Sequence, residues 1–265
     1  MRLPSSFAAP GLPALAPTGS GPLYRQVKRE LQRLVESGQY GPGDTLPGES
    51  TLARALAVSI GTLRRAVDEL VHEHLLVRRQ GKGTYVALHN DDRFLFQFFH
   101  VQLREDPGQP AAAARREYPK VECVGFARGK ADEAEAAALH VRPGHPVLRA
   151  DNRLSLAGRP VVHDRLVLSA ELFRGLGEKR FVERPSTIYA LYQSDHGITV
   201  LRAHERARAI PANRDTARIL GVAVGSPVLE VHRTALTFGE RPVEYRISTI
   251  NTAAHDYVSL LSKAT

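Results

Sequence analysis

The spacing of apolar residues near the start of the chain predicts three short helices followed by a hairpin. The first helix begins after Pro22 and has apolar residues three and four positions apart: Leu23, Val27, Leu31, Leu34 and Val35. A second helix is predicted over 49–56. A third helix is predicted from Ser59, its N-cap, to about residue 74. Five of its apolar side chains are expected to point into the core: Leu63, Ala66, Val67, Leu70 and Val71. Two β-prone runs, 76–80 and 84–86, flank a glycine turn and predict the hairpin.

Apolar and polar residues alternate in the second half of the chain, and the pattern there occurs twice. The run Gly144-His145-Pro146-Val147-Leu148 matches Gly225-Ser226-Pro227-Val228-Leu229, 81 positions later, and 158–162 matches 239–243 with one more residue between. A helical stretch precedes each copy, at 132–139 and 213–220. Two copies of strand, helix, strand, turn and strand predict one antiparallel sheet of approximate two-fold symmetry, with a pocket near the axis. The fold class is therefore α+β.

The chain divides by composition and pattern into four expected parts. Residues 1–21 are rich in Pro, Ala, Gly and Ser and predict a flexible leader. The helices and hairpin occupy 22–88, a link covers 89–117, and the duplicated domain covers 118–265. Within the link, 93–99 predicts a strand and 107–114 a loop. Between the two copies another helix is predicted, capped by Ser186 or Thr187 and ended by Gly197.

Charge favours a polyanionic partner such as nucleic acid, because the formal net charge is +8 and the pI about 9.9. Residues 22–87 hold ten basic and seven acidic residues, so the excess is not confined to them. Cys123 is the single cysteine; it lies in a predicted strand and is interpreted as a structural thiol in a reducing compartment. No apolar run approaches the ~18 residues of a membrane span, and the N-terminus does not resemble a signal peptide. We therefore expect a cytoplasmic protein.

Three motifs in order identify a family resemblance in the first part. The runs 46–53 (LPGESTLA), 58–66 (VSIGTLRRA) and 81–86 (GKGTYV) resemble the GntR superfamily of winged-helix repressors, over about residues 22–88. The resemblance implies a homodimer that binds an inverted repeat in double-stranded DNA. Ser50 and Ile60 stand where well-studied members usually carry arginine. The usual operator preference of the family therefore should not be transferred.

The DNA-binding residues follow from how a helix enters the major groove, with its N-terminal side chains at base edges. The third helix supplies six of these residues: Ser59, Ile60, Gly61, Thr62, Arg64 and Arg65. Ser50, in the second helix, is also assigned to the DNA-binding surface. The hairpin, or wing, offers Arg78, Arg79 and Lys82 to the backbone or minor groove, and its glycines permit close approach: Gly81 and Gly83. A solvated basic helix and hairpin without DNA contact is the alternative.

The second half resembles the effector domain of the HutC branch, the UTRA domain, which has a chorismate-lyase-like fold. The Gly-x-Pro-Val-Leu runs, the Ile-Tyr helix start and 241–245 (RPVEY) carry this resemblance over about 118–262. It implies an effector pocket with five matching positions: Arg153, Asp164, Thr187, Glu244 and Tyr245. An arginine and a helix start at Ser186 and Thr187 suit an anion, so a small anionic metabolite is expected. Alternatively, Arg153 forms a structural pair with Asp151, Asp164 or Glu244.

Two other functions compete with a ligand-responsive regulator, expected to be a repressor. One is an enzyme of chorismate-lyase-like fold, and the other is a GntR regulator with an all-helical, metal-dependent effector domain. The sequence shows no nucleophile elbow, no Gly-rich nucleotide loop and no metal-spaced His/Cys set. We therefore expect no catalytic residue, no cofactor and no metal. The duplication and the two-residue periodicity argue against the all-helical domain.

Overall fold

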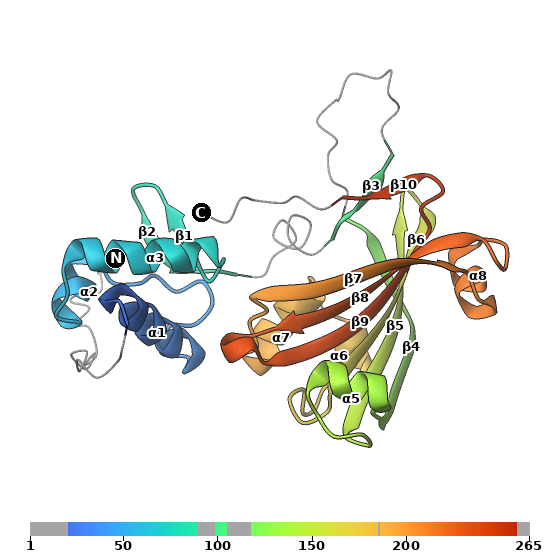
Figure 1. Cartoon of the computed structure of the whole chain (residues 1–265), viewed down its shortest axis with the longest axis horizontal. Helices are drawn as coiled ribbons and strands as arrows, with labels where there is room; N and C mark the ends of the chain where they lie inside the picture. The colour runs from blue at the N-terminus through green and yellow to red at the C-terminus, as the bar shows by residue number, and fades with distance from the viewer. Residues whose placement is uncertain (1–20, 89–98, 105–117, 185, 259–265) are drawn as a thin grey trace, which may run out of the picture. The chain divides into compact units, whose positions relative to one another are not determined.

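The computed structural model describes residues 21–88, 99–104, 118–184 and 186–258. The chain forms two compact units, residues 1–88 and 89–265, which are considered one at a time (Figure 1). The predicted leader before residue 21, the predicted strand up to 98 and the predicted loop over 107–114 lie outside the described residues. Within them, no helix combines the length and apolar character needed to cross a membrane.

The first unit contains the three helices and the hairpin that periodicity predicted. They are α1 (Leu23–Glu36), α2 (Glu49–Ala55), α3 (Ile60–His72), β1 (Leu76–Arg79) and β2 (Gly83–Val86). Helices α1 and α2 both pack on α3, which buries an apolar stripe between them: Leu63, Ala66, Val67 and Leu70. Two predicted positions differ: Leu23 is 44% exposed and Tyr24 takes the buried position at the start of α1, and Val71, expected to point inward, is only half-buried.

The second unit is built on a six-stranded antiparallel sheet whose order reproduces the sequence duplication. The first copy gives β4 (Lys120–Lys130), β5 (Pro146–Leu156) and β6 (Arg159–Ser169), and the second gives β7 (Arg202–Pro211), β8 (Pro227–Leu236) and β9 (Pro242–Ile250). The order β4-β5-β6-β9-β8-β7 joins the copies through β6 and β9. The expected two-fold arrangement is confirmed, with its axis between these two strands.

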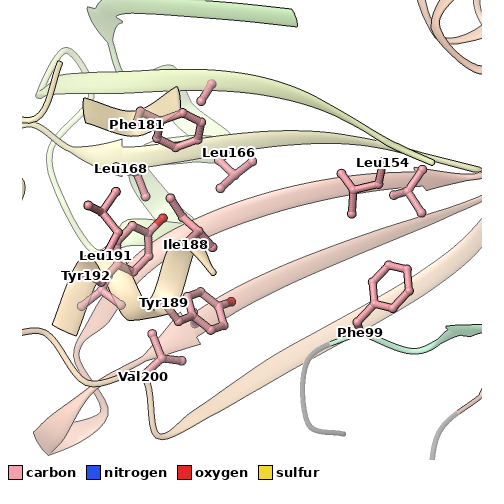
Figure 2. Close-up of a cluster of buried hydrophobic side chains, with 14 of the residues drawn as sticks. Phe99, Leu154, Leu166, Leu168, Phe181, Ile188, Tyr189, Leu191, Tyr192 and Val200 are labelled. Atoms are coloured by element: carbon pink, nitrogen blue, oxygen red, sulfur yellow. The ribbon is translucent and has the colours of Figure 1, made fainter. Parts of the chain in front are cut away.

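The sheet has two differently covered faces. Helices α5 (Glu133–Leu139) and α8 (Arg214–Leu220) cover one face, where α5 packs on Val147, Val167 and Tyr245. We call this the α5 face. On the other face, the α7 face, α6 (Glu178–Val182) and α7 (Ile188–His196) pack over the main apolar core, which includes Leu166, Leu168, Phe181 and Tyr192 (Figure 2).

A short ribbon closes one side of the α7 face. The ribbon consists of strand β3 (Val101–Leu103) paired with β10 (His255–Tyr257). Separately, a 3₁₀ turn (Phe238–Glu240) joins β8 to β9. Phe99 and Val101 belong to the same apolar core as α7, and Tyr257 packs against it. The ribbon is therefore part of the core that the two sheet copies share.

Side-chain caps begin helices α5, α7 and α8 of this unit, whereas α6 starts at Gly177 without one. The α5 helix has a capping box: Asp132 Oδ1 accepts from the Glu135 amide at 2.8 Å, and the Asp132 amide donates to the Glu135 carboxylate at 3.0 Å. Asn213 caps α8 in the second copy without the reciprocal bond. Thr187 caps α7, since its Oγ1 accepts from the Ala190 amide at 3.1 Å. Of the two predicted caps of α7, Thr187 is the one used.

The capping box predicts a difference between the two copies. Asp132→Ala should lower the free energy of unfolding by about 1 kcal/mol, because an amide at the helix start loses its acceptor. Asp132→Ser should retain most of the stability, since a serine hydroxyl also accepts there. Asn213→Ala should cost no more than Asp132→Ala. Urea-induced unfolding followed by circular dichroism measures all three, and an unchanged Asp132→Ala variant would contradict the prediction.

Candidate nucleic-acid interface and buried polar cluster

The exposed start of α3 carries two hydroxyl groups that bond to each other. Ser59 Oγ accepts from the Thr62 amide at 3.1 Å and lies 2.8 Å from Thr62 Oγ1. Ser59 is therefore the N-cap that the sequence predicted. Ile60 is 43% exposed, and Gly61 beside it is also exposed, so neither contributes to the core. This end of the helix offers two hydroxyls, one apolar side chain and a bare backbone to a partner.

The arginines predicted to contact DNA are held by acidic and aromatic neighbours. Arg64 Nε donates to Glu49 Oε2 at 2.6 Å, and this hydrogen bond raises the pKa of the exposed guanidinium. Arg78 pairs with Asp68 and, at 3.4 Å, with the same Glu49. Glu49 therefore joins α2, α3 and β1. Sequence reasoning missed Glu49 and Asp68, because their partners lie 10 to 29 positions away along the chain.

Two further arginines lie over aromatic rings, and the tip of the hairpin is open. The Arg65 guanidinium carbon is 4.0 Å from the centre of the Tyr24 ring, and that of Arg79 is 4.8 Å from the Tyr85 ring. Lys82 is exposed at the tip and forms no ion pair with a described carboxylate. The tip needs two glycines with positive φ: Gly81 at 70° and Gly83 at 110°.

The remaining residue assigned to DNA, Ser50, is exposed on α2 next to Glu49.

A buried ion cluster lies on the α7 face beside the repeat axis. Glu244 is fully buried; it accepts from Tyr189 at 3.1 Å and Tyr192 at 2.6 Å, and from two nitrogens of Arg246 at 2.9 and 3.0 Å. Burial disfavours charge on Arg246, but its carboxylate partners outweigh that effect and raise the pKa of the guanidinium well above its usual value. Burial and Glu244 both raise the pKa of Tyr192, so its hydroxyl stays protonated and donates.

The cluster extends to both copies of the repeat. Asp164 on β6 accepts from Arg246 at 3.1 Å and from Ser248 at 2.5 Å. On β8, buried Arg233 pairs with Glu205, which also accepts from the Tyr257 hydroxyl. These described residues hold three carboxylates and two guanidiniums. An anion placed beside Asp164 would therefore meet an excess of negative charge.

The second unit has two hollows, one over the middle strands of the sheet and one along its edge strand β4. One is a cavity of about 20 Å³, room for a single water molecule, bounded by Asp164, Arg233, Arg246 and the β3–β10 ribbon. The other is an open groove of about 720 Å³ along β4, lined by Lys120, Cys123, Arg184 and Ser186 among others. A row of facing residues on the α7 face runs between them: Cys123, Asn152, Asp164 and Ser248.

Asn152 in this row and Arg184 at the groove each have a polar atom without a partner in the described part of the chain. Asn152 Oδ1 and Arg184 Nε are buried, and neither makes a hydrogen bond within the described residues. Burial lowers the pKa of Arg184, whose guanidinium forms no ion pair with a described carboxylate. Burial likewise raises the pKa of the Cys123 thiol, as expected for a structural cysteine. Unsatisfied buried polar atoms are rare in folded proteins and mark places where a further group can bind.

The five pocket positions expected from the family resemblance do not all meet. Asp164, Thr187 and Glu244 lie on the α7 face, but Arg153 and Tyr245 face α5. The cause is the two-residue alternation of a strand: Asn152 and Arg153 are neighbours, as are Glu244 and Tyr245, so each pair points to opposite faces. Arg153 Nη2 donates to Glu122 at 2.7 Å. Arg153 is thus in an ion pair, with a partner that was not among the expected ones.

The remaining expected positions have defined surroundings. Tyr245 lies with its hydroxyl 2.6 Å from His232 Nδ1, on the α5 face. Thr187 is buried, and its Oγ1 accepts the hydrogen bond that caps α7. Ser186 lines the groove along β4 at the start of the same helix. The α7 face therefore unites Asp164, Ser186, Thr187 and Glu244 with Asn152 and Arg184, two residues that sequence reasoning missed.

Comparison with known proteins matches both units. The model of bacterial regulatory proteins of the gntR family matches residues 23–86, and the UTRA domain model matches 114–256. The NagR repressor of Bacillus subtilis is 29% identical over 80% of this chain and 84% of its own length. The histidine utilization repressor of Pseudomonas putida is 28% identical over 85% of this chain and 86% of its own length. These families and relatives are transcriptional regulators, not enzymes.

Solved structures agree with the fold. A ligand-binding domain from Bordetella bronchiseptica, described as that of a GntR-family transcriptional regulator, has a TM-score of 0.56 and 30% identity, covering 63% of this chain and 99% of that domain. PhnF from Mycobacterium smegmatis has a TM-score of 0.52 and 24% identity, covering 90% of this chain and all of PhnF. The second unit is thus a UTRA domain, the first is a winged helix-turn-helix, and the chain belongs to the GntR family of bacterial transcriptional regulators.

Proposed function

We propose that this protein is a transcriptional repressor that binds operator DNA through its first unit and releases it when a small anionic metabolite occupies the second. The observation that carries the proposal is the row of polar residues on the α7 face together with the groove beside it, where Asn152 Oδ1 and Arg184 Nε lack partners among the described residues. Relatives named as repressors at 28–29% identity support the direction of the response.

The proposed DNA surface combines the start of α3, the start of α2 and the hairpin. Its residues are those that the sequence suggested: Ser50, Ser59, Ile60, Gly61, Thr62, Arg64, Arg65, Arg78, Arg79, Gly81, Lys82 and Gly83. The exposure of Ile60 and Lys82 supports this assignment. Ile60 is suited to a thymine methyl, while Lys82 is suited to a phosphate. Pairing of two such surfaces in a homodimer would fit an inverted-repeat operator in double-stranded DNA.

Lys82 provides the test of the hairpin. Lys82→Ala should weaken binding to operator and scrambled duplexes by the same factor, because a phosphate contact carries no sequence information. The slope of log affinity against log salt should fall by about 0.9 for each phosphate group that the variant no longer neutralises. Fluorescence anisotropy measures both, and Lys179→Ala on α6 is the matched control with the same change of charge. Weaker binding to the operator alone would contradict a phosphate contact.

The proposed effector site follows the row of polar residues on the α7 face. Its anionic group is assigned to Arg184 and the start of α7 at Ser186 and Thr187, since a guanidinium without a carboxylate partner and a helix N-terminus both favour an anion. A hydroxyl group of the effector would then reach Asp164, which lines the cavity, while buried Glu244 would act by holding Arg246 and α7. The excess of carboxylates around Arg246 is the reason for this orientation.

The small size of the cavity bears on how a ligand would act. A space of about 20 Å³ cannot hold a metabolite, so binding there requires its walls to separate. Phe99 and Val101 form one wall, and the chain leading to the first unit joins the second unit just before them. Displacement of the β3–β10 ribbon would move the point at which the connecting chain enters the second unit. The difference in the effector's affinity for the closed and the opened cavity would then set the size of the shift in DNA binding.

Asn152 and Arg153 give a matched test of the effector site, being neighbours on opposite faces of one strand. Asn152→Leu should leave the ligand-free protein as stable as the parent or more so, because it removes an unsatisfied buried oxygen. It should reduce the thermal shift produced by anionic metabolites that stabilise the parent. Arg153→Gln should keep that shift. A thermal-shift screen measures both, and loss of the shift in Arg153→Gln alone would contradict the assignment.

We place the dimer contact in the second unit, since the first must present its small surface to DNA. A fragment of residues 89–265 should therefore run as a dimer in light scattering. It has to include Phe99 and Val101, which belong to the core of this unit. A monomeric fragment beside a dimeric full-length chain would move the contact to residues 1–88.

A further inference from the structure

Glu49 occupies a central position on the surface assigned to DNA. It is the first residue of α2, and its side chain is 31% exposed. One carboxylate oxygen accepts from Arg64 Nε at 2.6 Å, and the other lies 3.4 Å from Arg78 Nη2. An acidic side chain that faces phosphates weakens binding, so its place among these arginines calls for a reason.

Stability does not supply that reason. Ion pairs between exposed side chains contribute about 0–1 kcal/mol, and Arg64 is 62% exposed. The core of the first unit rests instead on the apolar stripe of α3. Removal of Glu49 should therefore leave the fold intact.

The geometry of the pair does supply a reason. Glu49 engages only Nε of Arg64, so both terminal nitrogens of the guanidinium remain without partners among the described residues. Recognition of guanine by arginine uses two donors at once, aimed at O6 and N7. An arginine side chain has several rotatable bonds, and anchoring Nε fixes the plane in which the two terminal nitrogens point. Glu49 thus prepares Arg64 for a bidentate contact.

We propose that Glu49 is a positioning residue that sets Arg64 to recognise a guanine in each half-site. This inference rests on the proposed role of α3 in DNA binding. Arg78, held between Glu49 and Asp68, is left in place to approach the DNA backbone. The negative charge of Glu49 weakens attachment to DNA in general, while the aligned guanidinium strengthens attachment to one base. Only the second effect increases discrimination, because general repulsion lowers the affinity for operator and for other sequences by the same factor.

The experiment is selection of binding sites from a random 30-base-pair duplex library by the full-length protein, followed by sequencing. The parent should select a guanine at one symmetric position of each half-site, and Arg64→Ala should lose that preference. Glu49→Ala should reduce the same preference about tenfold while the other selected positions remain. Glu49→Gln keeps an oxygen acceptor and should restore part of it. Glu30→Gln, which removes a carboxylate paired with Arg33 on α1, should change nothing.

Each outcome decides the matter. Loss of preference at the Arg64 position alone, with an unchanged melting temperature, supports a positioning role. Unchanged guanine preference in both Glu49 variants overturns it, and so does an equal loss at every position. If Glu49→Ala fails to fold, Glu49→Gln gives the comparison. A parent protein that selects no sequence overturns the proposed DNA surface and this inference together, whereas the first two outcomes concern Glu49 only.

Discussion

The buried guanidinium of Arg246 is the group on which the second unit depends. It neutralises Glu244 and reaches Asp164, so strands β6 and β9 and helix α7 meet around one positive charge. Removing one member of such a buried group costs about 3–5 kcal/mol, because the remaining charge loses its partner in a poorly solvated place. Tyr189 and Tyr192 bond to the same Glu244, which ties α7 to the sheet. The position of α7, and with it the proposed anion site, therefore depends on this charge.

Much of the fold could be predicted because each element carries its own periodicity. The duplication predicted the six sheet strands with α5 and α8, and helical spacing predicted α1, α2 and α3. Helix α7 was predicted from its own start, whereas α6 and the β3–β10 ribbon were not predicted. The start of α1 was an exception: Leu23 and Tyr24 are both apolar enough for the core, and only packing selects between them. Side-chain caps were predicted at Ser59 and narrowed to two candidates at α7, because capping is a local interaction.

The candidate sites were harder to predict, since they depend on which face of the sheet each strand presents. Strand alternation alone would have separated Glu244 from Tyr245. Separating Arg153 from Asp164 needed the register of β5 on β6, where Asn152 faces Asp164 and Arg153 faces His163. The register of β5 on β6 shifts after Leu154, between these residues and the turn that joins the two strands. Counting positions from that turn therefore assigns the wrong partners to Asn152 and Arg153. Glu49 was missed because its partners are distant in sequence.

The sequence duplication has one consequence for the ion cluster. Counting 82 positions from Asp164 leads to Arg246, and 81 from Asn152 leads to Arg233. Asp164 and Arg246 therefore occupy corresponding places in the two halves and carry opposite charges. Asn152 and Arg233 also correspond, and of these only Arg233 is charged. Two identical halves joined across the same axis would bring equal charges together there, and burial would make them repel. The central ion pair exists only because the halves differ, so this sheet cannot be assembled from two copies of either half.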